Sequence, residues 1–194
     1  MTLEEILTSR DARVERQREL LSAHPGLSLI CLTVQLPGPV KRDALSLAVA
    51  EAGVKAVREA FCVEIEELRD LETGYEGFFM TALPPLEAKR LACQIEDTHP
   101  LGRLMDLDVS ICAGQQLEPG RVHSRFAAAE YGLSSTAAPA PSFPTPLGRE
   151  ELGLEPRKCL LCDRPARECM RARTHSTREM LEKYKESVDF YLKS

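Results

Sequence analysis

The sequence lacks a hydrophobic segment long enough to cross a membrane, and it lacks an excess of positive charge. No apolar run approaches the ~20 residues of a membrane-spanning helix. Its 25 Lys and Arg residues are outnumbered by 30 Asp and Glu residues, and the net charge of −5 argues against a general binder of nucleic acid or membrane surfaces. The N-terminal stretch is charged and acidic, unlike an export or transit signal. We therefore expect a cytoplasmic protein with no nucleic-acid and no membrane partner.

An even set of disulfide-forming cysteines is also missing, because the chain has 7 cysteines and no visible export signal. Four are scattered through apolar segments, where a free cysteine is usually a small core residue. These four are Cys31, Cys62, Cys93 and Cys112. The other three are clustered between residues 159 and 169 and need a separate explanation.

No internal repeat is visible, and 194 residues are the usual size of one domain with or without an appendage. Strand-like and helix-like apolar patterns alternate over residues 1–132. We expect helices at 3–23, from a cap at Asp43 to Phe61 and after Pro84–Pro85, and strands at 27–36, 77–83 and 104–112. This order predicts an α+β or α/β body with a small mixed or antiparallel sheet flanked by helices.

Proline, alanine and serine accumulate at 133–147, where too little apolar surface is present to offset the entropy of ordering. We predict a linker or loop there, between the body at 1–132 and a Cys/Arg-rich segment with a last helix at 148–194. Ser176 and Glu179 have the spacing of a capping box for that helix. An apolar stripe should pack it on the body. The stripe consists of Leu181, Tyr184, Val188 and Tyr191.

Two aspartates interrupt the last expected strand of the body, although strands seldom hold aspartate. Side chains alternate along a strand, so Asp106 and Asp108 share one face, roughly 7 Å apart at their Cα atoms. The opposite face is a clean core face. Its residues are Met105, Leu107, Val109 and Ile111.

A divalent cation would remove the repulsion between the two carboxylates, and Mg²⁺ prefers such hard oxygen ligands. Arg103, of a type that binds phosphate with two hydrogen bonds, precedes the pair, and Gly102 allows close backbone approach. The alternative is an amphipathic edge strand whose aspartates are simply solvated. Periodicity alone does not separate the two interpretations.

A cationic, cysteine-bearing stretch lies between Arg157 and Arg173, with a local charge of +4 on a chain of −5. Such a concentration on an acidic protein suggests a specific anion site, and polyphosphate is the natural ligand of several arginines. Its cations are Arg157, Lys158, Arg164, Arg167, Arg171 and Arg173.

The same stretch holds a candidate zinc site, since three thiolates and an imidazole complete a tetrahedral shell. The four candidate ligands are Cys159, Cys162, Cys169 and His175. The short gap between the second and third cysteines is less typical of zinc fingers, and reduced thiols without a metal are the alternative. His175 has two further interpretations, as the residue before a helix cap or as a proton carrier near an anion.

Four segments carry a resemblance to a known family. They are Pro37-Gly-Pro-Val-Lys41, Thr73-Gly-Tyr-Glu-Gly77, Glu96 to Val109 with GRLMDLDV, and Arg157 to His175 with RKCLLC. In this order and over most of the chain, the sequence resembles the apo-citrate lyase phosphoribosyl-dephospho-CoA transferase family, also called citrate lyase holo-acyl-carrier-protein synthase. The chain departs from the family pattern at Tyr75, where we expect proline.

The resemblance implies transfer of a phosphoribosyl-dephospho-CoA group from its triphosphate precursor to a serine of the citrate lyase acyl carrier subunit, with release of pyrophosphate. Asp106 and Asp108 would hold Mg²⁺, and Glu96 and His99 are candidate helpers as base or outer ligand. Arg103 is a further catalytic candidate, which would neutralise phosphate oxygens. The substrate-binding candidates are Gly102, Lys41, Arg157, Arg164, Arg171 and Arg173. Two alternatives stay open: a sister enzyme acting on another carrier, such as that of malonate decarboxylase, and a non-catalytic zinc-dependent interaction module.

Overall fold

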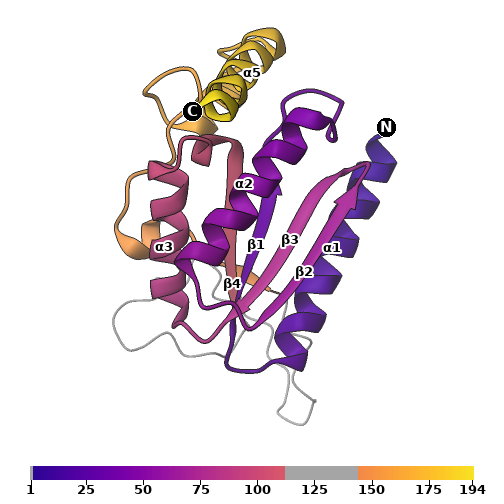
Figure 1. Cartoon of the computed structure of the whole chain (residues 1–194), viewed down its shortest axis with the longest axis vertical. Helices are drawn as coiled ribbons and strands as arrows, with labels where there is room; N and C mark the ends of the chain where they lie inside the picture. Colours follow the sequence, from indigo (N-terminus) through magenta and orange to yellow (C-terminus); the bar gives the residue numbers. More distant parts are fainter. Residues whose placement is uncertain (1, 112–143) are drawn as a thin grey trace, which may run out of the picture.

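The computed structural model describes residues 2–111 and 144–194 and shows one α+β domain around a five-stranded sheet (Figure 1). The strand order is β2-β3-β1-β4-β5, and every pairing is antiparallel. The strands are β1 (Ser28–Val34), β2 (Ile65–Leu71), β3 (Gly74–Thr81), β4 (Met105–Ile111) and β5 (Thr145–Pro146). The helices are α1 (Leu3–Ala23), α2 (Ala44–Ala60), α3 (Pro85–Thr98), α4 (Ala166–Ala172) and α5 (Thr177–Lys193), with short 3₁₀ turns η1 (Gly102–Leu104) and η2 (Glu150–Leu152). The predicted fold class is confirmed.

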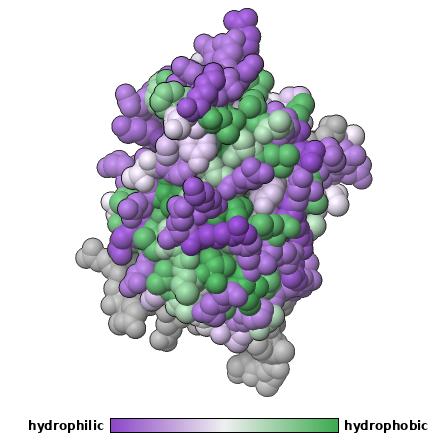
Figure 2. Space-filling view, viewed as in Figure 1, coloured by the Kyte–Doolittle hydropathy of each residue, from purple (hydrophilic) through white to green (hydrophobic). Residues whose placement is uncertain are grey.

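The main core lies on one face of the sheet, under α2 and α3, which run side by side across it (Figure 1). Leu32, Phe79, Leu107 and Val109 point into this core and are fully buried. They alternate with residues of the other face, as the pleat of a strand requires. On the side of the molecule that Figure 2 shows, hydrophobic residues gather over its middle, whereas the top end is mainly hydrophilic.

The opposite face of the sheet carries α1 and a smaller core. Leu20 and Leu21 of this helix pack against Leu29, Phe78 and Met80. This cluster covers only part of that face. Asp106 and Asp108 lie on the same face, so the body has one apolar side and one side that becomes polar toward one end of the sheet.

The expected caps and the main elements are confirmed, and β2, β5 and α4 are added to them, with β5 inside the stretch predicted as a linker or loop. Asp43 and Ser176 accept hydrogen bonds from Ser46 N and Glu179 N at the starts of α2 and α5. Strand β2 was not predicted, because its sequence IEELRDL is too charged to read as a strand without the partner β3 that pairs with it.

The cysteines and the Pro/Ala/Ser stretch need separate comment. Cys31 and Cys93 are buried as expected, but Cys62 is exposed just beyond the end of α2. Cys112 and residues 133–143 of the predicted linker lie outside the described residues. At the end of that linker, Leu147 is buried and follows the two residues that pair with β4.

The last helix packs on the body through its predicted stripe. Tyr184 and Val188 are buried in the main core, and Tyr191 packs against it, whereas Leu181 is 39% exposed. No helix in the described ranges is both long and apolar enough to cross a membrane.

Candidate functional site

Asp106 and Asp108 sit side by side on β4, on the face that also carries α1. Thr33 pairs with Asp106, and Cys31 pairs with Asp108, across the neighbouring strand β1. The alternation predicted for this strand is confirmed, because Met105 and Leu107 are fully buried on the other face. The carboxylates therefore cannot be part of the main core, and both are accessible in part.

Both carboxylate oxygens of Asp106 accept a hydrogen bond. Arg157 donates to one from Nη1 at 3.2 Å, and Gln35 donates to the other from Nε2 at 2.8 Å. These donors come from the cysteine-bearing segment and from the chain just after β1. Asp106 is thus held in one orientation by residues that are far apart in the sequence.

Asp108 has an environment that disfavours its charged form. Although the side chain is partly exposed, desolvation and then repulsion from the Asp106 carboxylate raise its pKa to about 6. The nearby cations Lys89 and Arg13 oppose this increase. A pair of carboxylates in which one resists ionisation is the arrangement that a bound cation would stabilise.

The outer edge of β4 is closed by side chains near the aspartates. Glu96 accepts a hydrogen bond from Leu107 N at 2.9 Å, and the Lys89 ammonium donates to Leu107 O at 3.2 Å. Arg157 Nη2 donates to Gly102 O at 2.9 Å and to Met105 O. These three side chains satisfy backbone groups that a further strand would otherwise pair with.

Glu96 is held tightly at this edge. Its Oε2 accepts a hydrogen bond from Arg149 Nη2 at 3.1 Å, and Arg157 Nη1 lies 3.7 Å from its Oε1. Arg149 also binds Asp97, at 2.7 Å. With 4% of its side chain exposed, Glu96 holds β4 and two arginines in place. Its role as a catalytic helper stays a prediction.

Arg103 lies next to Arg157 with part of its guanidinium out of contact with any acceptor. Its Nε atom is buried and has no hydrogen-bond partner in the described part of the chain. Burial, and then the charge of Arg157, lower the pKa of Arg103. A half-buried cation beside a second cation is a place where an anion would be favourable. Gly102 has a packing role, because a Cβ there would lie 2.5 Å from Ile95 O.

His99 and Lys41 make their contacts elsewhere. The His99 ring packs against the Tyr191 ring of α5, with the centroids 5.5 Å apart and the planes tilted by 50°, and its Nδ1 accepts from Leu101 N at 3.0 Å. Burial lowers the His99 pKa. Lys41 donates to Leu36 O at 2.8 Å. The described contacts therefore join Asp106 with Glu96 and Arg157, and they do not include His99 or Lys41.

The four predicted zinc ligands come together in a group that could hold a metal. The donor atoms of Cys159, Cys162, Cys169 and His175 all lie within 4.8 Å of one another. The Cys162 Sγ lies 3.5 Å from the Cys169 Sγ and 3.4 Å from the His175 Nε2. With metal–sulfur bonds of ~2.3 Å, ligands of a tetrahedral zinc site stand roughly this far apart.

Local structure explains why these ligands meet. Lys158 and Pro165 form an antiparallel bridge, which folds the chain back so that Cys159 and Cys162 flank a tight turn. Cys169 lies on α4, and His175 precedes the cap of α5. A hydrogen bond from Arg164 N–H and then one from His175 lower the pKa of Cys162 to about 6. A thiol that ionises near neutral pH is a good metal ligand.

The remaining arginines of the predicted anion site are exposed on this same unit. Arg164 hydrogen-bonds the Cys162 sulfur, and Arg171 and Arg173 make no ion pair with the described residues. Among these cations only Arg157 contacts an aspartate of β4 in the described ranges.

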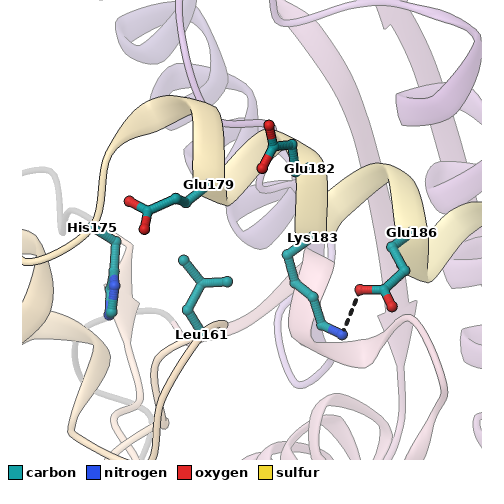
Figure 3. A pocket seen from close by; sticks show the side chains of 6 residues that line it. All are labelled: Leu161, His175, Glu179, Glu182, Lys183 and Glu186. Atoms are coloured by element: carbon teal, nitrogen blue, oxygen red, sulfur yellow. Dashed lines mark hydrogen bonds and ion pairs between the residues drawn. The ribbon is translucent and has the colours of Figure 1, made fainter.

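A cleft between the cysteine-bearing segment and α5 has the wrong charge for a polyphosphate (Figure 3). It encloses about 590 Å³, and three of its side chains are carboxylates. Its lining residues are Leu161, His175, Glu179, Glu182, Lys183 and Glu186. On the aspartate face of β4, in contrast, Arg157 lies 3.2 Å from Asp106.

Three residues on the aspartate face were missed by sequence reasoning. Arg13 of α1 donates to Glu76 of β3 at 3.1 Å, and Glu76, Thr33 and Asp106 form one row across three strands. Glu76 is 3% exposed, and its burial raises its pKa while Arg13 opposes the increase. Gln35 is the third. Glu76 could have been found, because it lies in the Thr73-Gly-Tyr-Glu-Gly77 match.

Comparison with known proteins agrees with the resemblance found in the sequence. A family model described as apo-citrate lyase phosphoribosyl-dephospho-CoA transferase matches residues 1–125 and 141–191. A Streptococcus pyogenes protein named "Probable apo-citrate lyase phosphoribosyl-dephospho-CoA transferase" is 34% identical over 181 residues, 92% of this chain and 80% of its own. A Shigella boydii protein named "Apo-citrate lyase phosphoribosyl-dephospho-CoA transferase" is 31% identical over 186 residues, which are 93% of this chain and 85% of the Shigella protein. This chain is therefore a transferase that belongs to the apo-citrate lyase phosphoribosyl-dephospho-CoA transferase family.

Proposed function

We propose that this protein transfers a phosphoribosyl-dephospho-CoA group from its triphosphate precursor to a serine of the acyl carrier subunit of apo-citrate lyase, releasing pyrophosphate. The observation that carries the proposal is the Asp106–Asp108 pair with Arg157 bound to Asp106, in a chain of this transferase family. Carboxylates for a cation and arginines for phosphate are the parts that phosphoryl-type transfer needs.

Asp106 and Asp108 would hold Mg²⁺, as the family resemblance implies. Bound there, Mg²⁺ would neutralise charge on the triphosphate as the bond to the leaving pyrophosphate breaks. Both oxygens of Asp106 already accept hydrogen bonds, so Arg157 and Gln35 orient the carboxylate before the substrate arrives. Asp108, with its raised pKa, becomes a ligand as it loses its proton to the solvent.

The arginines and the partner supply the remaining parts. Arg103, whose charge lies near that of Arg157, would bind phosphate oxygens with its guanidinium. The attacking hydroxyl is the carrier's serine, so this chain needs no nucleophile of its own and forms no covalent intermediate. The exposed cations Arg164, Arg171 and Arg173 would meet an acidic carrier, since complementary charge speeds encounter and selects partners.

We also propose that the Cys₃His group binds zinc. Three thiols and one imidazole suit Zn²⁺ better than Mg²⁺, which prefers oxygen. Four protein ligands would leave no position for water or substrate, so this second metal site would be structural and not catalytic.

Incubation of the protein with Mg²⁺, the triphosphate precursor and the apo-carrier tests the function directly. The intact mass of the carrier should increase by one prosthetic group. Asp106→Asn should lower the rate by a factor on the order of 10²–10³ without unfolding the protein. Asp11→Asn, on an exposed position of α1, is the matched control and should keep the rate. Full activity of Asp106→Asn would contradict the metal role.

The same assay separates the alternatives. If only the malonate decarboxylase carrier gains mass when both apo-carriers are offered, the chain is the sister enzyme. Stoichiometric zinc with no transfer to either carrier would support a zinc-dependent interaction module. The cytoplasmic location stays a prediction.

A further inference from the structure

The segment from Arg157 to His175, called here the cysteine segment, has little apolar surface with which to hold itself in place. Most of its side chains are exposed, Met170 at 71%. Cys159 and Cys169 are buried, and Leu160 packs in part against the main core. Segments of this size with so small a core usually depend on a metal or a crosslink for a fixed structure.

Anchors on the body flank the cysteine segment. Before it, Arg149 binds Glu96 and Asp97 at the end of α3. After it, Tyr184 and Val188 fix α5 in the core. Between these anchors, within the described residues, the polar contact with the body is that of Arg157 on β4. The segment thus has one polar joint to the strand that carries the aspartates.

Arg157 is tied to both parts at once. Its carbonyl accepts a hydrogen bond from Ala166 N at 2.8 Å, and two residues later Cys159 N donates to Arg164 O at 2.8 Å. This short ribbon carries two of the four metal ligands. At the other end of the same residue, the guanidinium donates to Gly102 O, Met105 O and Asp106. Anything that fixes the ribbon also fixes where this guanidinium lies.

We propose that a metal ion bound by the Cys₃His group fastens Arg157 over the edge of β4, so that this metal sets the position of Asp106 without touching the substrate. Arg157 is then a positioning residue that couples the two sites. The effect on the rate rests on the proposed function, whereas the coupling does not. Coupling is reciprocal, so loss of the Arg157 contacts must weaken metal binding as much as metal loss weakens those contacts.

The first test measures metal affinity without any substrate. Co²⁺ titrated into the reduced, metal-free protein gives absorption bands that report thiolate ligation. Arg157→Ala keeps all four ligands and should bind Co²⁺ roughly 10-fold or more weakly, as loss of an outer partner of a metal site does. Arg167→Ala removes the same charge from an exposed position on α4 and should bind Co²⁺ like the unmodified protein. Equal affinity of Arg157→Ala and Arg167→Ala would overturn the proposal.

The second test follows the structure and the rate. Removal of the metal with a chelator should open the cysteine segment to trypsin, with cuts after Arg167, Arg171 and Arg173, and metal addition should restore protection. With the carrier assay, Arg157→Ala should lower kcat and leave the KM for the carrier unchanged, and Arg157→Lys should recover part of kcat. A change in KM alone would contradict a positioning role. If the unmodified protein shows no transfer, and Arg157→Ala nevertheless weakens Co²⁺ binding, the proposed function fails and the coupling stands. If the protein is active and Arg157→Ala binds Co²⁺ with unchanged affinity, the coupling alone is rejected.

Discussion

The body and the cysteine segment are held together by different physical means. The body buries whole side chains on both faces of a sheet, with Leu32, Phe79 and Leu107 fully out of solvent. The cysteine segment buries two thiols and part of one leucine, and four side chains that could hold a metal meet at its centre. Buried apolar area stabilises the body, whereas the metal proposed for the Cys₃His group would stabilise the cysteine segment.

Because of this difference, the two parts should respond to different perturbations. A packed core responds to lost volume, because its neighbours relax only in part. A metal-centred segment responds to chelators and to the protonation and oxidation of its thiols. The aspartates lie where the two parts meet, at the edge of β4.

The largest effect is expected from lost core volume in the body. Leu107→Ala should lower the free energy of unfolding by about 3 kcal/mol, because Leu107 is fully buried. Leu160→Ala in the cysteine segment should cost only about 1 kcal/mol, since that side chain is half-buried. Urea unfolding measures both. Equal costs would show that the segment shares the core of the body.

A smaller loss is expected at the joint between the two parts. Glu96→Gln removes the charge that Arg149 and Arg157 face and should cost about 2 kcal/mol, less than a fully broken buried pair because Arg149 keeps Asp97. The pH profile of transfer should keep its shape if Glu96 only positions β4. Glu59→Gln, at an exposed position on α2, serves as the control and should be neutral. Loss of the ascending limb of the profile would show that Glu96 is the base.

A gain is expected where α5 meets the body. The Tyr184 hydroxyl is buried with no hydrogen-bond partner in the described ranges, and burial raises its pKa. Tyr184→Phe should therefore stabilise the protein by up to about 1 kcal/mol, because it removes an unsatisfied polar group. Thermal unfolding checks this, with Tyr191→Phe, a partly exposed position, as a control that should change little. A clear loss of stability in Tyr184→Phe would mean that a bound water satisfies the hydroxyl.

Thiol labelling compares the two parts with no change in stability. Burial raises the pKa of the Cys31 thiol, and its side chain is buried, so it should stay unlabelled at pH 8. Exposed Cys62 should react at pH 8 with or without metal. The three thiols of the cysteine segment should react after chelation only. Peptide mass mapping assigns each modified cysteine, and labelling of the segment in metal-loaded protein would contradict a bound metal.

Local patterns predicted those parts of the fold that depend on nearby residues. The caps at Asp43 and Ser176, the alternation around Asp106 and the stripe on α5 are all set within one turn or one strand. Strand β2 was missed because charged residues form a strand there only by pairing with β3. The resemblance, not the periodicity, identified the family.

The site was predicted in part for the same reason. The Cys₃His ligands lie close in the sequence, so their spacing was informative. The contacts of Asp106 with Gln35 and Arg157, and the row through Glu76, join residues 51 or more positions apart or on different strands, which no spacing reveals. Glu96 and Arg157 read as candidate catalytic and phosphate-binding groups, and only the structure shows how many of their polar atoms already serve β4.

The side chains of Lys89, Glu96 and Arg157 along β4 have one more consequence. The backbone groups that these side chains bind cannot form hydrogen bonds with a strand from another molecule. This part of the β4 edge therefore resists both amyloid-like stacking and pairing with a second copy. Strand addition is therefore disfavoured along this part of β4, whereas β2 forms the opposite edge of the sheet.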